Sequence, residues 1–235
     1  QLSIAMSGGG IRSSLFNIGV LKALYDQGVL DKVDVISSVS GGSYTTYWLY
    51  TNQMASPQER FGFRTFENRH FPQRVCEIIT EGNFVTMPAM VGYFFTGFGS
   101  SRAMYQRALV RTYGDMDTKN PVLMKDLAPL VSSGNAPYLI VNTSTRGGDE
   151  KSLAWSKRLY EFTPLHYGNA ERGFSLWNGR RHELQLAAVT SGAALAVLNH
   201  KFSQPFPESA GNEFVKLYDG GKTENLGAVA PLLRG

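Results

Sequence analysis

Residues 32–50, KVDVISSVSGGSYTTYWLY, join a β-rich run to two glycines and a segment of helical length. The run ends at Val39, and Ser40 comes directly before Gly41 and Gly42. A serine at a sharp strand-to-helix turn has its hydroxyl thrust out of the sheet, and the helix N-terminus favours developing negative charge. The stretch therefore predicts a strand, a tight turn and a helix, with Ser40 as a candidate nucleophile.

The turn departs in one position from the usual G-x-S-x-G elbow, because Ser38 stands where the first glycine is expected. Serine is small, so we expect a strained but tolerable backbone. A serine before two glycines also serves as a helix cap, and this alternative stays open.

A second turn lies upstream, where SGGGIR (7–12) follows the apolar run LSIAMS and precedes a helix that ends near Gly28. Consecutive glycines at a helix start expose N–H groups that bind anions. A dinucleotide loop of the G-x-G-x-x-G type would need glycine where the chain has Ser13, and no P-loop lysine follows Arg12. The remaining uses are close helix–sheet packing or an oxyanion hole, with N–H groups near Gly9 and Gly10 facing the oxyanion formed at Ser40.

A nucleophile also needs a base. The four histidines, at positions 70, 166, 182 and 200, lie at no obvious strand end, and none follows Asp219. A triad of His200 with Asp126 or Asp149 stays open.

Asp219 is the stronger candidate base because it ends the apolar strand FVKLYD and precedes Gly220 and Gly221. In a parallel sheet the strand C-termini share one edge, so its carboxylate should emerge beside Ser40. This role requires partial burial, which raises the basicity of the carboxylate, and a direct hydrogen bond to Ser40. The alternative is an Asx turn.

The alternation of strands and helices predicts an α/β three-layer fold, with a mostly parallel central sheet and helices on both faces. Further strands are expected at 137–145 and 213–221, an edge strand at 153–163 and a helix at 182–199. We expect one domain, 1–235, with its core at 1–56 and 136–235. Residues from about 57 to 135, punctuated by prolines, form a predicted helical insertion.

Together, SGGGIR, SVSGGS and DGG resemble the patatin-like and cytosolic phospholipase group of serine lipid acyl hydrolases. FTPLHYGNAERG (162–173) and LYDGGKTENLGAVAPLLR (217–234) resemble the cytosolic phospholipase branch. The resemblance implies a Ser–Asp dyad, with Ser40 as nucleophile and Asp219 as base. It also implies an oxyanion loop, with the residues Gly8, Gly9 and Gly10, and support from Arg12 and Gly41.

On this resemblance we expect hydrolysis of carboxylic esters of glycerophospholipids, with no metal or organic cofactor. Related activities with the same dyad stay open: a lysophospholipase, a neutral-lipid lipase or an acyltransferase. From other classes, a catalytically silent lipid-binding module and a nucleotide-binding protein also stay open.

The chain has 235 residues, 43% of them apolar, a net charge of +4 and one cysteine, Cys76. Its scattered cations do not favour nucleic acid as a partner. No apolar stretch reaches about 18 residues, so we expect a soluble or peripheral protein, cytoplasmic or at a membrane surface. Because the chain starts without Met and enters a strand-like run within two residues, we also expect it to be a fragment of a longer protein. FVTMPAMVGYFFTGF (84–98) is the candidate membrane contact or a core segment, and Arg102, Arg107 and Arg111 follow it.

Overall fold

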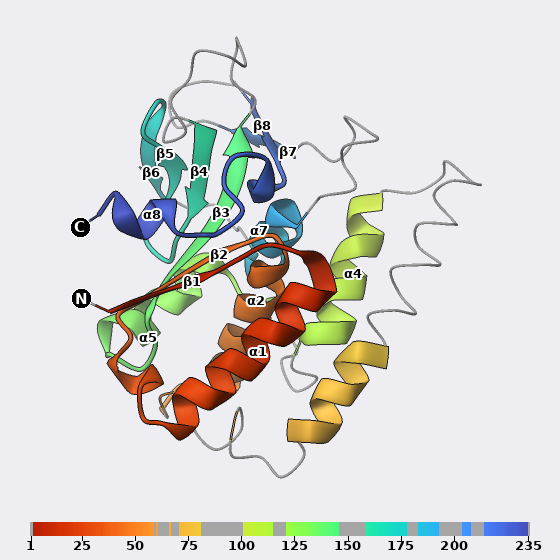
Figure 1. Ribbon diagram of the computed structural model, residues 1–235. Coiled ribbons are helices and arrows are strands. Elements are labelled where there is room, and N and C mark those ends of the chain that lie inside the picture. The colour runs from red at the N-terminus through yellow and green to blue at the C-terminus, as the bar shows by residue number, and fades with distance from the viewer. Residues whose placement is uncertain are drawn as a thin grey trace.

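A computed structural model gives the architecture of the chain (Figure 1). It describes residues 2–58, 60, 66, 71–80, 101–114, 121–145, 158–177, 183–192, 204–207 and 214–234. Within these ranges a single sheet holds eight strands. They are β1 (Ser3–Met6), β2 (Val35–Val39), β3 (Tyr138–Thr145), β4 (Leu159–Phe162), β5 (His166–Asn169), β6 (Gly173–Leu176), β7 (Gln204–Pro207) and β8 (Phe214–Tyr218).

The helices include the two predicted to follow the glycine-rich turns. They are α1 (Gly10–Asp26), α2 (Gly41–Ala55), α4 (Ser101–Tyr113), α5 (Ala128–Ser132), α7 (Leu184–Ser191) and α8 (Val229–Leu232), with short 3-10 helices η1 (Leu30–Lys32), η3 (Met124–Leu127) and η6 (Gly220–Lys222). Residues 71–80 are also helical. Gly28, with φ +64°, follows the end of α1 as expected.

The strands run in the order β1-β2-β3-β4-β5-β6, and β8 pairs with both β3 and β7. The pairs β1–β2 and β2–β3 are parallel. The other pairs of the described sheet are antiparallel. The prediction of a mostly parallel sheet is therefore wrong, because parallel pairing is confined to the first three strands, with α1 between β1 and β2 and α2 between β2 and β3.

β3 organises the sheet because it is long enough to pair with two strands along one edge. β2 pairs with its first part, from Tyr138 to Asn142, and β8 pairs with Ser144 and Thr145. β4 occupies the opposite edge of β3. β2 and β8 thus lie on the same edge and run toward each other, so their C-terminal ends meet beside the middle of β3.

β4 is an interior strand, since it pairs with β3 and β5 and all four of its residues are buried. The prediction of an edge strand at 153–163 is wrong. The strand begins at Leu159, after the alternating part of that segment. Residues 151–157 lie outside the described residues.

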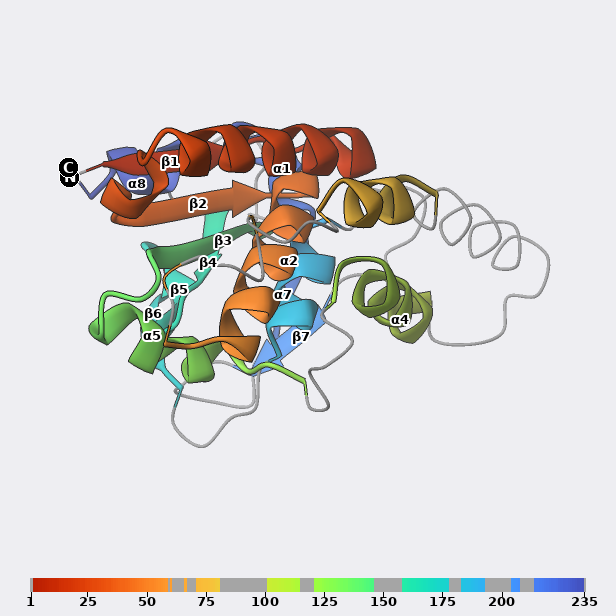
Figure 2. The ribbon, with the colours of Figure 1, turned by 90° about the horizontal axis from the view of Figure 1, so that it is seen from below.

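Side chains of successive sheet residues enter two different cores, as a strand's alternation requires. Ile36, Leu139 and Val141 belong to the main core with residues of α1, α2 and α7. On the other face Val35 and Ile140 pack with Ala230 of α8. Figure 2 shows α2 and α7 side by side. The sheet lies between the layer of α1, α2 and α7 on one face and α8 on the other, as the three-layer prediction requires.

Parts of the segment 57–135 contribute to the same main core. Its buried members are Phe66, Ile78, Leu109, Tyr113, Val122, Met124, Leu127 and Leu130.

No helix within the described part of the chain has the length and apolar character needed to cross a bilayer. The predicted membrane contact at 84–98 lies outside the described residues.

Candidate active site

Ser40 occupies a sharp turn between β2 and α2, as the sequence predicts. Its φ of 51° and ψ of −120° make it the one non-glycine residue with positive φ in the described ranges. Such a conformation costs on the order of 1–3 kcal/mol and persists only where surrounding contacts enforce it. The hydroxyl is held at the start of α2, and the residue is 6% exposed.

Ser38, the departure from the usual elbow, takes part in a buried hydroxyl network beneath the turn. Its Oγ lies 3.2 Å from Ser43 Oγ and 3.1 Å from Thr46 Oγ1 on the first turns of α2. A hydroxyl in place of the expected glycine therefore ties the end of β2 to α2.

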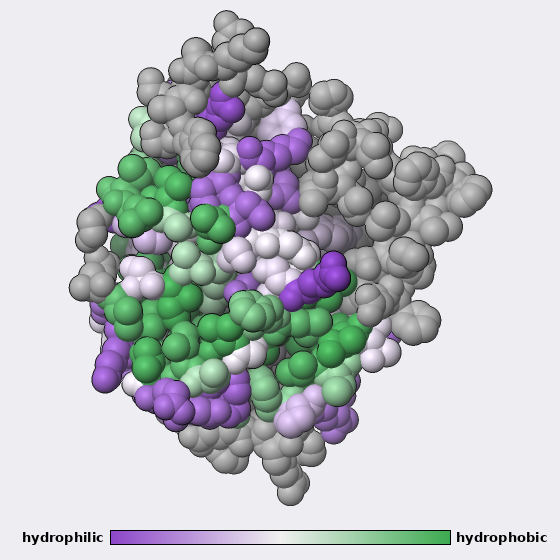
Figure 3. Space-filling view, in the orientation of Figure 1, coloured by the Kyte–Doolittle hydropathy of each residue, from purple (hydrophilic) through white to green (hydrophobic). Residues whose placement is uncertain are grey.

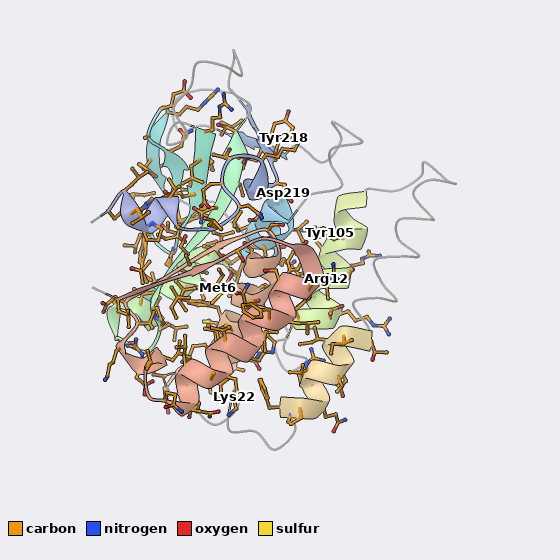
Figure 4. The ribbon with its side chains drawn as sticks, viewed as in Figure 1. Met6, Arg12, Lys22, Tyr105, Tyr218 and Asp219 are labelled. Atoms are coloured by element: carbon orange, nitrogen blue, oxygen red, sulfur yellow. The ribbon has the colours of Figure 1, made fainter. Side chains whose placement is uncertain are left out.

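Asp219 follows β8 (Figure 4). Its two carboxylate oxygens have different partners. Oδ2 accepts a hydrogen bond from Ser40 Oγ at 3.3 Å. Oδ1 accepts the N–H of Gly221 at 2.7 Å and so caps η6. One carboxylate oxygen thus makes the Asx-type cap and the other faces the serine, so the cap does not exclude the contact that the role of base requires. The role of Asp219 as base stays a prediction.

Burial raises the pKa of Asp219 to about 6. The hydrogen bonds from Gly221 and Ser40, and then the charge of Lys222, act in the opposite direction and lower the pKa. A carboxylate with this raised pKa is a stronger proton acceptor than an exposed one and is still ionised at neutral pH.

The two side chains meet for a different reason than the sequence suggests. The argument from gathered parallel strand ends is wrong, because β8 is antiparallel to β3. Ser40 and Asp219 come together because β2 and β8 approach head-on along β3 and both end there. Gly220 allows this contact: a side chain on it would place Cβ 2.4 Å from the Asn142 carbonyl oxygen.

The glycine-rich turn before α1 packs directly on the serine turn. A Cβ on Gly41 would lie 2.1 Å from the carbonyl oxygen of Gly10, so only glycine permits this contact. The N–H of Gly8 donates to the Asn225 carbonyl at 2.8 Å. The remaining N–H groups of the loop, those of Gly9 and Gly10 at the start of α1, have no acceptor within the helix and are the candidate oxyanion donors.

Arg12 lies exposed on the first turn of α1 (Figure 4). Arg107 and Arg111 of α4 are also exposed, and the side chain of Arg102 lies outside what the structure describes. The role of Arg12 stays a prediction.

The triad alternatives find no support in the described residues. Asp126 accepts the N–H of Leu123 in a capping contact. His166, the one histidine in the described ranges, lies half-buried on β5 near Tyr138, where burial lowers its pKa. Asp149 and the other histidines, at positions 70, 182 and 200, lie outside the described residues.

Several residues at the site were not predicted. Ser191, the last residue of α7, accepts the N–H of Ser40 at 2.9 Å. Next to it, the Gly192 carbonyl lies 3.1 Å from the hydroxyls of Tyr44 and Tyr105, which also hydrogen bond to each other. Asn142, whose side chain donates to the Ser38 carbonyl, was not predicted either. The sequence did mark it, because it is a polar residue inside the apolar run PYLIVNTST.

Burial raises the pKa of both tyrosines above the ordinary value, so their hydroxyls are protonated at neutral pH. Tyr105 belongs to α4, and its contact joins that helix to the end of α7.

Among the described residues no three His, Cys, Asp or Glu side chains are grouped as a metal site would require.

A family model described as patatin-like phospholipase matches residues 4–232. A structure of human GIVD cytosolic phospholipase A2 is similar, with 17% identity and a TM-score of 0.56, over 89% of this chain and 30% of that one. A second structure of it, in complex with methyl gamma-linolenyl fluorophosphonate, has 18% identity and a TM-score of 0.53, over 93% and 34% of the two chains.

The chain thus spans about a third of the length of these structural neighbours. No curated protein matches it. At this level of identity the structural neighbours establish the fold, which confirms the α/β three-layer prediction.

Proposed function

Because the chain belongs to the patatin-like phospholipase family, we propose that it hydrolyses carboxylic esters of glycerophospholipids through an acyl-enzyme on Ser40. Asp219 acts as the base in this proposal. The observation that carries it is the hydrogen bond of 3.3 Å between Ser40 Oγ and Asp219 Oδ2, made by a carboxylate whose pKa burial raises to about 6. A hydroxyl and a proton acceptor in direct contact are the requirement for an activated serine.

In the first half of the reaction, Ser40 Oγ attacks the ester carbonyl carbon and its proton passes to Asp219. The negative charge that develops on the carbonyl oxygen is bound by the N–H groups of Gly9 and Gly10. One such donor contributes about 2.7–4 kcal/mol to the stability of the transition state. The ester bond then breaks, and the leaving alcohol takes the proton from Asp219.

In the second half, a water molecule attacks the acyl carbonyl carbon and gives its proton to Asp219. The bond to Ser40 Oγ breaks, the proton returns to the serine, and a fatty acid leaves. The second carboxylate oxygen keeps its contact with Gly221 throughout, so Asp219 holds its orientation while Oδ2 gains and loses the proton.

A lipid surface is the proposed source of the substrate. Phe16 of α1 is 70% exposed and Leu226, in the segment after Asp219, is 66% exposed. Phe16 lies on α1, the helix that follows the glycine-rich turn, and Leu226 follows Asp219 in the chain. Figure 3 shows hydrophobic residues over α1. Arg12 lies on the same helix and supplies a cation for the lipid phosphate. The methyl gamma-linolenyl fluorophosphonate in a structural neighbour supports a ligand with a long hydrocarbon chain.

The proposal is tested with a fluorophosphonate probe and with vesicles of defined phosphatidylcholine. We expect the probe to label the protein at Ser40, located by peptide mass, and fatty acid to be released from the vesicles. Ser40→Ala should lose both while keeping its thermal unfolding temperature within a few degrees. A folded protein that neither labels nor releases fatty acid would indicate a silent binding module instead.

A further inference from the structure

Ser191 lies outside the proposed dyad, yet its hydroxyl touches three groups of the site. The residue ends α7 and is fully buried. Its Oγ lies 2.5 Å from the Asn142 carbonyl oxygen, 2.9 Å from the Ser40 nitrogen and 3.0 Å from Ser43 Oγ. A buried hydroxyl with this many partners is held in a single orientation.

The directions of these hydrogen bonds follow from the atoms involved. A carbonyl oxygen only accepts, so the one proton of Ser191 goes to Asn142. A backbone N–H only donates, so one lone pair of Ser191 accepts from Ser40, and the other accepts the hydroxyl of Ser43. The donor and both acceptor positions of Ser191 are therefore filled.

The two backbone partners of Ser191 are the N–H of Ser40 and the carbonyl of Asn142, and both residues help to bring the nucleophile and the base together. Ser40 has the strained φ of 51°. Asn142 lies on β3 where β2 and β8 meet, and its side-chain Nδ2 donates to the Ser38 carbonyl at 2.9 Å. Gly220, next to Asp219, packs against the same Asn142 carbonyl. One hydroxyl thus connects the nucleophile's backbone to the strand that also locates the base.

We infer that Ser191 is a positioning residue for the nucleophile, holding the Ser40 turn at hydrogen-bonding distance from Asp219. This inference rests on the proposed function. Ser191 touches neither reacting atom of the dyad and acts through the backbone of Ser40. Without its hydroxyl, the N–H of Ser40 and the carbonyl of Asn142 each lose a buried partner, and the strained turn loses a contact that enforces it.

The test compares Ser191→Ala with Thr190→Val, a matched control on the adjacent residue. Thr190 is also buried, but its hydroxyl donates to the Leu186 carbonyl within α7. The measurements are the maximal labelling rate, kinact, and the half-saturating concentration, KI, of a fluorophosphonate probe. Because a misplacement of about 1 Å costs on the order of 100-fold in rate, we expect kinact to fall about 10- to 100-fold in Ser191→Ala, with KI unchanged.

Thr190→Val should keep both constants within about twofold of the wild-type values, since the hydroxyl that it removes is bonded to the Leu186 carbonyl within α7 and not to Ser40 or Asn142. Unchanged kinact in Ser191→Ala, or an equal loss in both variants, would overturn the inference. If Ser191→Ala does not fold, Ser191→Cys keeps a similar shape with a weaker donor and acceptor, and it should lose a smaller factor in kinact. Wild-type kinact in that variant would also overturn it.

Failure of the proposed function gives a different result. In that case the wild-type protein itself does not label at Ser40. Labelling of the wild-type protein, together with an unaffected Ser191→Ala, contradicts only the role of Ser191.

Discussion

At Asp219, the burial that raises the pKa to about 6 sets the pH at which the proposed base is active. The carboxyl group accepts a proton from Ser40 only when it is ionised. We therefore expect the second-order rate of fluorophosphonate labelling to rise about tenfold per pH unit below pH 6 and to level off above it. Rates measured between pH 4.5 and 8.5 check this, and a rate independent of pH would contradict the assignment.

The same raised pKa costs stability at neutral pH. The unfolded chain ionises near the ordinary value of 3.8, whereas the folded protein stays protonated until about 6. Between these values the unfolded state has already lost the proton that the folded state retains. The contribution of Asp219 to folding stability is thus fully present below pH 3.8, falls as the pH rises to 6 and stays low above.

Asp219→Asn removes this buried charge and keeps an oxygen for the N–H of Gly221. We expect the variant to be inactive, yet more stable than the wild type by up to about 3 kcal/mol at pH 8. The difference should largely vanish at pH 4. Urea unfolding at both pH values measures it. Asp26→Asn, at an exposed carboxylate paired with Lys22, is the control, and should change stability by less than about 1 kcal/mol.

Single residues of the site were predictable where the chemistry demands a residue type. Ser40 and Asp219 stand before paired glycines at strand ends, and this pattern is local. Ser191 carries no such signal, because its importance arises from a hydrogen bond to a residue 151 positions away in the chain. Asn142 stands out as a polar residue in an apolar run, but its partner, 104 positions away, does not follow from that pattern. Sequence spacing alone does not show which buried polar groups meet.

At the scale of elements, two turns and one long strand assemble the site. The turns before α1 and α2 were predictable, since glycine runs between apolar segments mark them. The antiparallel direction of β8 was not predictable, because nothing in the short apolar sequence FVKLY distinguishes a parallel from an antiparallel strand. The length of β3 leaves an edge beyond Asn142 that β8 occupies, and this place in the sheet does not by itself fix the direction of the strand.

The contact between the two turns gives a prediction at this scale. Gly41→Ala would place a methyl group 2.1 Å from the Gly10 carbonyl oxygen, so the candidate oxyanion loop and the nucleophile turn must separate. We expect labelling at Ser40 to fall at least about 100-fold, as a displacement of this size does in active sites. Labelling within threefold of the wild type would contradict the packing.

Gly19→Ala is the matched control for this change. Gly19 lies within α1, and a Cβ there meets nothing within 4 Å. Alanine is favoured over glycine inside a helix by about 0.5–1 kcal/mol, so this variant should be slightly more stable and label at the wild-type rate. Thermal unfolding and labelling of both variants separate a specific contact from a general intolerance of glycine substitution.

At the scale of the whole molecule, the segment 57–135 shares one hydrophobic core with α2, the helix that follows Ser40. The sequence predicts an insertion there, because prolines interrupt its helical pieces, but it does not show that Ile78 and Leu109 are buried with Leu49 of α2. Hydrophobic periodicity identifies an apolar face without identifying its partner. The shared core implies that loosening the segment 57–135 also loosens α2 and the Ser40 turn before it.

Ile78→Ala and its neighbour Ile79→Ala test this coupling. Ile78 is fully buried in the main core and Ile79 is 41% exposed. Removing the Ile78 side chain should cost about 2–5 kcal/mol through lost burial and a cavity, whereas the change at Ile79 should cost less than about 1 kcal/mol. In urea, we expect Ser40 labelling and tryptophan fluorescence to be lost at one shared midpoint, which Ile78→Ala lowers for both. Trp48 of α2 contacts Phe66 and Phe71 of this segment, so its fluorescence reports their packing. If only the fluorescence midpoint moved and labelling persisted, this packing would be lost independently of the Ser40 site.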